Sequence, residues 1–433
     1  MPRKVTLFPL IAAIYLMVAG GPFGLEDIVS KSGYAGAIAI LLVTPAVWSL
    51  PTALMVSELA SALPSEGGYY VWVTRAMGRF WGFQEAWLSL AGSVFDMAIY
   101  PTLSVDYLGH FAPTLTAGGR GIWIGVALIA MCALWNLLGA KTVGGSSLAL
   151  TIVLLAPFAI LAAYAGFHRA APGAPAVPLH DVDILGGILV AMWNYMGWDN
   201  ASTIAGEVDR PQRTYPLAMG GAVVLVAATY VVPIAAVAMT GLDANRWSTG
   251  GWADVARAVV GGGAAGGVVA VAITIGGMLG ALGTLNALTM AYSRLPAVMA
   301  QDGFLPGVLA KCRPKTGAPW VAIFACSAAW ALCLGFSFVK LIVLDVLLTG
   351  LSILLEFAAL VALRIREPGL ERPYRVPGGL FGAIAVGVPP LALLVLTVIR
   401  NERGTHWADQ CPRIRRAADR SRSCMLFFER ALS

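Results

Sequence analysis

The stretch VAGGPFGLEDIV, residues 18–29, interrupts a strongly apolar segment and sets two carboxylates, Glu26 and Asp27, directly after the interruption. Pro22 lacks an N–H donor and its ring clashes with the preceding helical turn, while the flanking glycines tolerate non-helical dihedral angles. Irregular backbone at membrane depth occurs only where it is buried in protein or lines a watery cavity. The stretch therefore predicts a functional break in a membrane helix, and a simple proline kink in a packed helix is the alternative.

The composition indicates a membrane protein with many spans. Of the 433 residues, 58% are hydrophobic and 12% are charged, whereas soluble proteins carry roughly 25% charged residues. The mean hydropathy is +0.77. The six cysteines form no CxxC pair and the four histidines form no ligand cluster, so we expect neither a metal nor a cofactor.

Eleven segments are long and apolar enough to cross a bilayer as helices, at about 20 residues per span. They are residues 6–29, 35–60, 82–108, 121–139, 146–167, 184–206, 217–241, 267–293, 319–337, 339–363 and 380–399. Lys and Arg concentrate in the loops that share a side with the N-terminus, which predicts a cytoplasmic N-terminus. We expect a multi-pass protein of the plasma membrane, with the lipid bilayer and no nucleic acid as its partner.

Residues 400–433 form a basic tail that contains no span. After eleven spans this tail would lie outside the cell, which conflicts with the positive-inside rule. Two interpretations stay open: a soluble basic tail, or a natural reading frame lost near residue 400 together with a twelfth helix. In both cases the transmembrane domain is predicted over 1–399, and the tail is not expected to pack into the bundle.

A second interruption lies in the sixth predicted span, in MWNYMGWDNASTIAGE, residues 192–207. Gly197 sits in mid-span with the polar residues Asn194, Asp199 and Asn200 around it. Broken helices at corresponding positions of two halves are typical of transporters built from inverted repeats. We therefore predict a first repeat over about 6–167, a second over about 184–363, and a peripheral helix over about 380–399.

Several acidic residues lie inside the predicted spans, where they are costly and usually functional. Asp96 lies in the third span with Tyr100 one turn further on, and Asp199 lies beside the second break. The tenth span carries a polar stripe at spacings of 4, 3 and 4, made of Asp345, Thr349, Ser352 and Glu356. These residues predict a ligand pathway, and buried hydrogen bonds between helices are the alternative. A phosphate-binding loop and a nucleophile–base pair are both lacking in the sequence, so we expect neither an ATP-driven pump nor an enzyme.

Three longer motifs resemble the amino acid–polyamine–organocation transporters. They are SELASALPSEGGYYVWV (57–73), IAGEVDRPQRTYPLAM (204–219) and YSRLPAVMAQDGFLPGVLAKCRPKTGAPWVAI (292–323). The stretches GGPFGLED, GFQEAWLSLAGSVFDMAIYPTLSVDYL and NYMGWDNASTIAGEVDRPQRT are similar to the polyamine-uptake branch, which is related to the L-type amino acid transporters. The resemblance covers about 1–399. It implies an all-α LeuT-type bundle of five-plus-five inverted repeats followed by two peripheral helices.

The resemblance also implies a substrate site between the two helix breaks. The unwound part of helix one would be Gly20, Gly21, Pro22, Phe23 and Gly24, and that of helix six Trp193, Tyr195, Gly197, Trp198 and Asp199. Trp193 matches the aromatic residue that stacks over substrate in arginine/agmatine antiporters of this family. One departure concerns the fifth span, 146–167, which lacks the lysine that substitutes for a sodium ion in some proton-coupled members.

The charges near the first break favour a cationic substrate without a carboxylate. Carriers of this fold hold a substrate carboxylate on backbone N–H groups at that break, but Pro22 removes one donor and Glu26 would repel an anion. We expect a secondary active transporter for polyamines, with a proton as the coupling ion. Substrate amines would pair with Asp96, Asp199 and Glu26, and methylenes would contact Phe23, Tyr100, Trp193 and Trp198. The alternatives are a cationic or neutral amino acid permease that uses the Gly21 and Gly24 amides, and a transporter-like nutrient receptor.

Overall fold

The computed structural model describes residues 6–65, 67–138, 147–169, 182–202 and 208–403, and these residues form helices without any strand. The helices are α1 (Leu7–Val18), α2 (Glu26–Thr44), α3 (Leu50–Ala62), α4 (Gly68–Met77), α5 (Arg79–Phe111), α6 (Pro113–Thr116), α7 (Arg120–Asn136), α9 (Ser147–Phe167), α10 (Ile184–Asn194), α11 (Pro211–Ala238), α12 (Trp252–Val260), α13 (Ala264–Gln301), α14 (Trp320–Ala331), α15 (Phe338–Arg366), α16 (Gly379–Ala385) and α17 (Val388–Arg403). A π-helical turn η1 (Pro45–Ser49) joins α2 to α3, and short 3₁₀ turns are η3 (Ala244–Arg246) and η4 (Gly307–Ala310).

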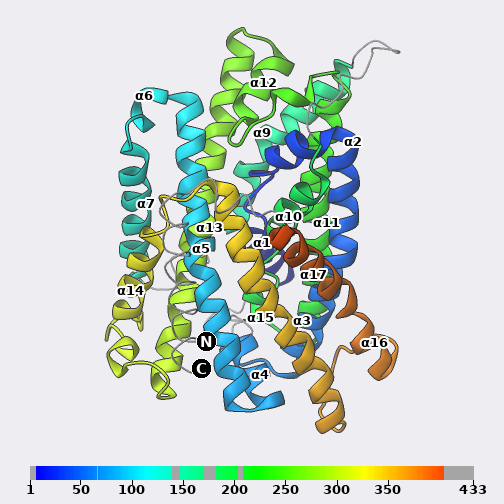
Figure 1. Cartoon of the computed structure of the whole chain (residues 1–433), viewed down its shortest axis with the longest axis vertical. Helices are drawn as coiled ribbons and strands as arrows, with labels where there is room; N and C mark the ends of the chain where they lie inside the picture. Colours follow the sequence, from blue (N-terminus) through cyan, green and yellow to red (C-terminus); the bar gives the residue numbers. More distant parts are fainter. Residues whose placement is uncertain (1–5, 66, 139–146, 170–181, 203–207, 404–433) are drawn as a thin grey trace, which may run out of the picture.

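The helices stand roughly side by side in one elongated bundle (Figure 1). Helices α4 and α16 lie at one end of the bundle, called here the α4 end, and α6 and α12 lie at the opposite, α12 end. The long helix α5 packs against both α13 and α15. Helix α1 packs against α9, α11 and α13, and α10 packs against α2 and α15. This packing places the two short helices α1 and α10 in the interior.

Six helices are long and apolar enough to cross a membrane by length and composition. They are Glu26–Ala62, Arg79–Gly109, Pro211–Ala238, Ala264–Gln301, Phe338–Arg366 and Gly379–Thr397. Four shorter apolar helices are Leu7–Val18, Arg120–Asn136, Thr151–Phe167 and Trp320–Ala331. The first and sixth predicted spans give the short helices α1 and α10 because each is interrupted partway. Residues 400–403 of the predicted tail form the last turn of α17, and the rest of the tail, 404–433, falls outside the described residues.

The chain turns a corner at Gly33, inside α2. This glycine has φ +67° and ψ 174°, a conformation that only glycine adopts at low cost. Residues 26–32 therefore form the second half of the first predicted span, and the chain after Gly33 continues as the second span through η1 into α3. Glu26 and Asp27 lie in the first turn of α2, where a carboxylate is favoured by the positive end of the helix dipole.

Large apolar side chains point outward from several helices. Val224 on α11 and Val268 on α13 are 70% and 69% exposed, and Ile160 on α9 is 58% exposed. Soluble proteins rarely expose contiguous apolar surface of this kind. The apolar exterior and the long apolar helices are those of a protein that crosses a membrane several times.

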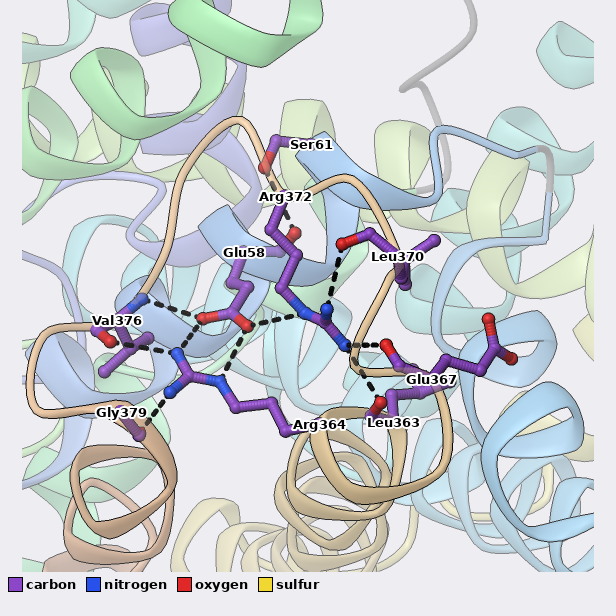
Figure 2. A network of polar contacts seen from close by, with 9 residues as sticks. All are labelled: Glu58, Ser61, Leu363, Arg364, Glu367, Leu370, Arg372, Val376 and Gly379. Atoms are coloured by element: carbon purple, nitrogen blue, oxygen red, sulfur yellow. Dashed lines mark hydrogen bonds and ion pairs between the residues drawn. The ribbon is translucent and has the colours of Figure 1, made fainter.

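At the α4 end, a buried network of ion pairs and hydrogen bonds connects α3 with α15 and the α15–α16 connection (Figure 2). Glu58 on α3 is fully buried and accepts a hydrogen bond from Arg364 Nε at 2.9 Å. Arg372 Nε lies 3.3 Å from the same carboxylate, and the Val376 N–H donates to it at 2.7 Å. Arg372 also donates to the main-chain oxygens of Leu363, Glu367 and Leu370. The network joins the end of α3 to the end of α15.

Candidate functional site

The first helix is unwound between Val18 and Glu26. Gly20, Gly21 and Gly24 all have positive φ angles, of 56°, 105° and 82°. Trp252 Nε1 donates to the main-chain oxygen of Pro22 at 2.7 Å, so a carbonyl freed by the break is satisfied by a neighbouring helix. A proline kink would change one turn of helix, whereas here the chain leaves the helical conformation over several residues. The predicted break is therefore present in the structure.

The second break begins where α10 ends, at Asn194. Gly197 has φ +93°, and a Cβ atom at this position would stand 2.7 Å from the main-chain oxygen of Met17 in α1. The two broken helices thus approach each other so closely that only glycine fits. Tyr230 on α11 donates to the Asn194 oxygen at 2.8 Å, and Trp198 Nε1 donates to the Tyr195 oxygen at 2.7 Å. These donors satisfy carbonyls that the break leaves free.

A narrow cavity lies between the two breaks and helices α5, α13 and α15. Its lining consists of Met17, Val18, Asp96, Tyr100, Trp193, Met196, Gly197, Asn200, Leu288, Tyr292, Asp345 and Thr349. The lining contains two acidic residues and no Lys, Arg or His. Half of the lining residues carry polar side chains, and the cavity of about 20 Å³ is closed around a water-sized space. We call this space the central cavity.

Asp96 is the most connected side chain of the central cavity. Its Oδ1 accepts hydrogen bonds from the Tyr100 hydroxyl at 3.0 Å and from Trp193 Nε1 at 3.2 Å. Its Oδ2 accepts from the Tyr292 hydroxyl at 3.2 Å. All three donors are neutral, so they fix the position of the carboxyl group and supply no opposite charge.

Asp345 brings a second carboxyl group to the same cavity. Thr349 Oγ1, one turn further along α15, donates to Asp345 Oδ1 at 2.8 Å. Helix α5 can approach this pair because Gly92 has no side chain, since a Cβ there would stand 2.4 Å from Thr349 Oγ1. Asp345 and Asp96 interact electrostatically. Two carboxyl groups without a basic partner among the described residues attract a cation.

Aromatic rings form much of the wall beside the two carboxyl groups. The Trp193 ring lies 6.1 Å from the Tyr100 ring, and it meets the Phe338 ring edge-on at 5.5 Å. Tyr292 closes the other side of Asp96. Such faces can bind methylene groups and can also attract a cation. The site therefore combines charge with apolar surface.

Four of the predicted site residues line the central cavity, namely Asp96, Tyr100, Trp193 and Gly197. The other nine do not appear in that lining: Gly20, Gly21, Pro22, Phe23, Gly24, Glu26, Tyr195, Trp198 and Asp199. Phe23 packs against the rings of Tyr107 and Phe158. Glu26 is fully buried and accepts a hydrogen bond from the Tyr107 hydroxyl.

The remaining members of this set support the second break. Tyr195 donates from its hydroxyl to the Leu41 oxygen at 2.9 Å, and Trp198 is fully buried. Asp199 is 4% exposed, and its Oδ1 has no hydrogen-bond partner among the described residues. Asp199 interacts electrostatically with Asp96. It therefore lies next to the cavity although its side chain does not form the wall.

Sequence reasoning missed Met17, Val18, Met196, Leu288 and Tyr292 as lining residues. Four of them are apolar residues in apolar stretches of sequence, and no local pattern distinguishes an apolar residue that faces a cavity from one that faces a helix. Tyr292 was within a quoted motif, but its bond to Asp96 joins residues far apart in the sequence. Among the described residues no group of three or more His, Cys, Asp or Glu could hold a metal ion.

A helical membrane bundle with two broken helices beside a carboxyl-lined cavity defines the class of LeuT-type transport proteins. The solved structure of MhsT in complex with L-phenylalanine has the same fold, with a TM-score of 0.64 at 13% identity, covering 92% of this chain and 99% of MhsT. The family model for amino acid permeases matches residues 10–407. The chain belongs to this family of permeases, and it is a transport protein and not an enzyme.

Individual relatives cover most of the chain. A probable polyamine transporter of Arabidopsis thaliana is 37% identical, covering 92% of this chain and 82% of the relative. A polyamine transporter of Oryza sativa subsp. japonica is 36% identical, with 92% and 74% covered. The serine/threonine exchanger SteT of Bacillus subtilis (strain 168) is 26% identical, with 86% and 85% covered.

Proposed function

We propose that this permease transports polyamines, with the central cavity as the substrate site. The observation that carries the proposal is the pair Asp96 and Asp345, two buried carboxyl groups in one cavity whose lining contains no basic residue. An isolated buried charge is costly, and a bound ammonium group removes that cost while forming charge-assisted hydrogen bonds. Hydrogen bonds to charged groups contribute about 1.5–3 kcal/mol each.

The substrate amines would bind to Asp96 and Asp345, with Asp199 as a third acceptor beside the cavity. The methylene chain would lie against Tyr100, Trp193 and Tyr292, which support the proposal through their position around Asp96. Phe23, Glu26 and the glycines of the first break would act indirectly, by shaping the backbone that closes the site. The similarity to plant polyamine transporters supports the same substrate class.

We further propose eleven membrane spans with five-plus-five inverted repeats, over about 6–167 and 184–363, followed by a peripheral helix. In this arrangement the α4 end faces the cytoplasm of a cell whose plasma membrane holds the protein. The basic residues of the α15–α16 connection support this orientation. Alternating access would then proceed by movement of the broken helices around the central cavity.

An amino acid is the second candidate substrate, favoured by the similarity to a serine/threonine exchanger. A carboxylate would have to bind at the first break, where the amides of Gly21 and Gly24 remain as donors. The pair of acidic side chains would then bind only the α-amino group. The two candidates therefore differ in whether a free carboxylate on the substrate helps or harms binding.

Uptake of radiolabelled substrates into proteoliposomes tests the proposal. We expect uptake of putrescine and spermidine that excess unlabelled polyamine abolishes and excess serine or threonine leaves unchanged. Uptake of an amino acid that polyamines fail to displace would contradict the polyamine assignment. Saturable binding of polyamine without any uptake would instead indicate a nutrient receptor.

A further inference from the structure

Two polar stripes face each other along α5 and α15. On α5 the stripe is Glu85, Ser89, Gly92 and Asp96, with spacings of 4, 3 and 4. On α15 it is Glu356, Ser352, Thr349 and Asp345, with the same spacings in the opposite direction. Residues at these spacings lie on one face of a helix, and α5 and α15 pack against each other over much of their length.

The stripes touch directly between the central cavity and the α4 end. Ser352 Oγ donates to Glu85 Oε1 at 2.7 Å, and Ser89 Oγ donates to the same oxygen at 3.0 Å. The two serine hydroxyls are 2.9 Å apart. Polar groups therefore continue from the two aspartates of the cavity to Glu85, about 16 Å further along α5 at 1.5 Å per residue.

Glu356 ends this row with an unusual environment. Its side chain is fully buried, and neither of its carboxyl oxygens has a hydrogen-bond partner among the described residues. Glu85 is also fully buried, and its Oε2 is unpartnered in the same sense. Glu356 interacts electrostatically with both Glu85 and Asp199.

The titratable groups around Glu356 come from three neighbouring elements. They are Glu85 on α5, Asp199 at the second break and the Tyr69 hydroxyl on α4. The basic residue nearest along α15 is Arg364, two turns further on, and it is bound to Glu58. No ion pair joins Glu85, Asp199 or Glu356 to a basic side chain within the described ranges.

Three buried carboxyl groups in this position require neutralisation, because unpaired charges are expensive away from water. The direct contacts of 2.7–3.0 Å among Ser352, Ser89 and Glu85 leave no room for an organic ligand between the helices. A proton needs no such room, since it binds to a carboxyl oxygen as an O–H bond. The two serine hydroxyls donate to one oxygen of Glu85, which leaves the other oxygen of Glu85 and both oxygens of Glu356 free to carry a proton.

We propose that Glu356, together with Glu85, is a proton-binding site that couples proton movement to transport. Asp199 interacts electrostatically with Asp96 of the central cavity and also with Glu356, so it is coupled to both. Binding of a proton forms an O–H bond on one carboxyl oxygen of Glu356 and removes its charge, and release of that proton to water restores the carboxylate. The inference rests on the transport function of the permease and does not depend on which substrate it carries.

Infrared difference spectroscopy on the purified protein tests the site without any substrate. Protonated carboxyl groups absorb in their own carbonyl region, separate from ionised ones. We expect Glu356→Gln to remove a pH-dependent band that the wild-type protein and Glu367→Gln both show. The control Glu367 directly follows the last residue of α15, and its partly exposed side chain is bound to Arg75. An unchanged spectrum in Glu356→Gln would overturn the proposal.

Proteoliposomes supply the second readout. We expect Glu356→Gln to reduce uptake driven by a pH gradient about tenfold, the size of a typical coupling between two ligands. Exchange of internal for external substrate at equal pH should stay close to wild-type, and Glu356→Asp should restore part of the driven uptake. Full pH-driven uptake in Glu356→Gln would contradict the proposal. If the wild-type protein takes up no polyamine, the polyamine assignment is refuted. The infrared spectra, which need no substrate, then decide whether Glu356 binds a proton.

Discussion

Two fully buried glutamates, Glu58 on α3 and Glu356 on α15, meet opposite environments. Glu58 lies within a network that includes Arg364, Arg372 and the Val376 N–H (Figure 2). Glu356 has no hydrogen-bond partner among the described residues and two acidic neighbours. The protein thus neutralises the charge of Glu58 with its own arginines. Glu356 has no such partner, and we propose that a bound proton neutralises it.

The same contrast separates the α4 end from the central cavity. At the α4 end the carboxylate of Glu58 is paired with Arg364 and Arg372, and these arginines also bind main-chain oxygens of α15 and of the α15–α16 connection. In the cavity Asp96 and Asp345 have only neutral donors. The fold therefore neutralises the charge of Glu58 with arginines of its own, whereas Asp96 and Asp345 keep the capacity to accept a cationic group.

The largest expected effect follows from breaking the Glu58 network. Glu58→Ala leaves Arg364 and Arg372 buried without a counter-charge, and removing one partner of a buried pair costs about 3–5 kcal/mol. We expect a markedly lower midpoint of thermal unfolding in detergent and a lower folded yield. Glu356→Gln is the matched variant, because it removes a buried charge that has no partner, and its stability should equal or exceed that of wild type. Equal destabilisation in both variants would break the comparison.

The next effect concerns Asp96 in the cavity. Asp96→Asn keeps the size of the side chain but removes the charge that binds a substrate amine, which is worth about 1.5–3 kcal/mol, or roughly 10- to 150-fold in binding. Uptake of putrescine should fall by that factor while insertion and thermal stability stay near wild type. Asp199→Asn should also reduce uptake strongly. Wild-type uptake in both variants would place the substrate site elsewhere.

A smaller effect is expected where the two broken helices touch. Gly197→Ala places a Cβ against the Met17 oxygen and forces an alanine into a left-handed conformation, at a cost of about 1–3 kcal/mol. Because Gly197 lines the cavity, we expect the rate of putrescine uptake to fall strongly while the midpoint of thermal unfolding changes little. Gly220→Ala on α11 is the control, since a Cβ there meets open space. Normal uptake in Gly197→Ala would show that the close approach of the helices is not needed.

The smallest effect concerns an exposed pair at the α4 end. Hydrogen bonding and charge from Arg75 lower the pKa of Glu367, whose carboxylate lies 2.7 Å from Arg75 Nη2. A carboxyl group with a lowered folded pKa stabilises the fold above its unfolded pKa, and this contribution is lost as the pH falls through the folded pKa. Solvent screens such a pair, so Arg75→Gln should lower stability only slightly at neutral pH. Between about pH 7 and pH 3, the thermal unfolding midpoints of the wild type and of Arg75→Gln should converge as the pH falls. A difference between the two midpoints that grows toward acid pH would contradict this.

The sequence allowed both helix breaks to be predicted, because proline and glycine act locally. Non-helical backbone is indicated by Pro22, Gly21 and Gly197 independently of their tertiary surroundings. The polar stripe of α15 was likewise visible from its spacing. The stripe on α5 has the same spacing, but Gly92 interrupts its polar pattern, so the sequence does not identify it. The glycine is needed because Thr349 of α15 packs directly against that position, which is a tertiary contact.

The wall of the cavity could not be predicted in the same way. Tyr292 and Asp96 are 196 residues apart, and only the packing of α13 on α5 brings them together. Glu26 carried charge beside the break, which suggested substrate binding, but its hydrogen bond to Tyr107 is a tertiary contact. Charge and periodicity in a sequence identify candidates, and the partner across the helix interface decides whether a candidate is structural or free to bind a ligand.

Equilibrium binding of a matched pair of ligands to the purified protein tests the central claim most directly. Putrescine and 4-aminobutyrate have similar chains, but the second carries a carboxylate in place of one amine. We expect the wild-type protein to bind putrescine at least about tenfold more tightly than 4-aminobutyrate. The variant Asp96→Asn should lose most of this preference. Equal or tighter binding of 4-aminobutyrate would show that the cavity recognises a carboxylate, and would contradict the assignment of its acidic side chains to substrate amines.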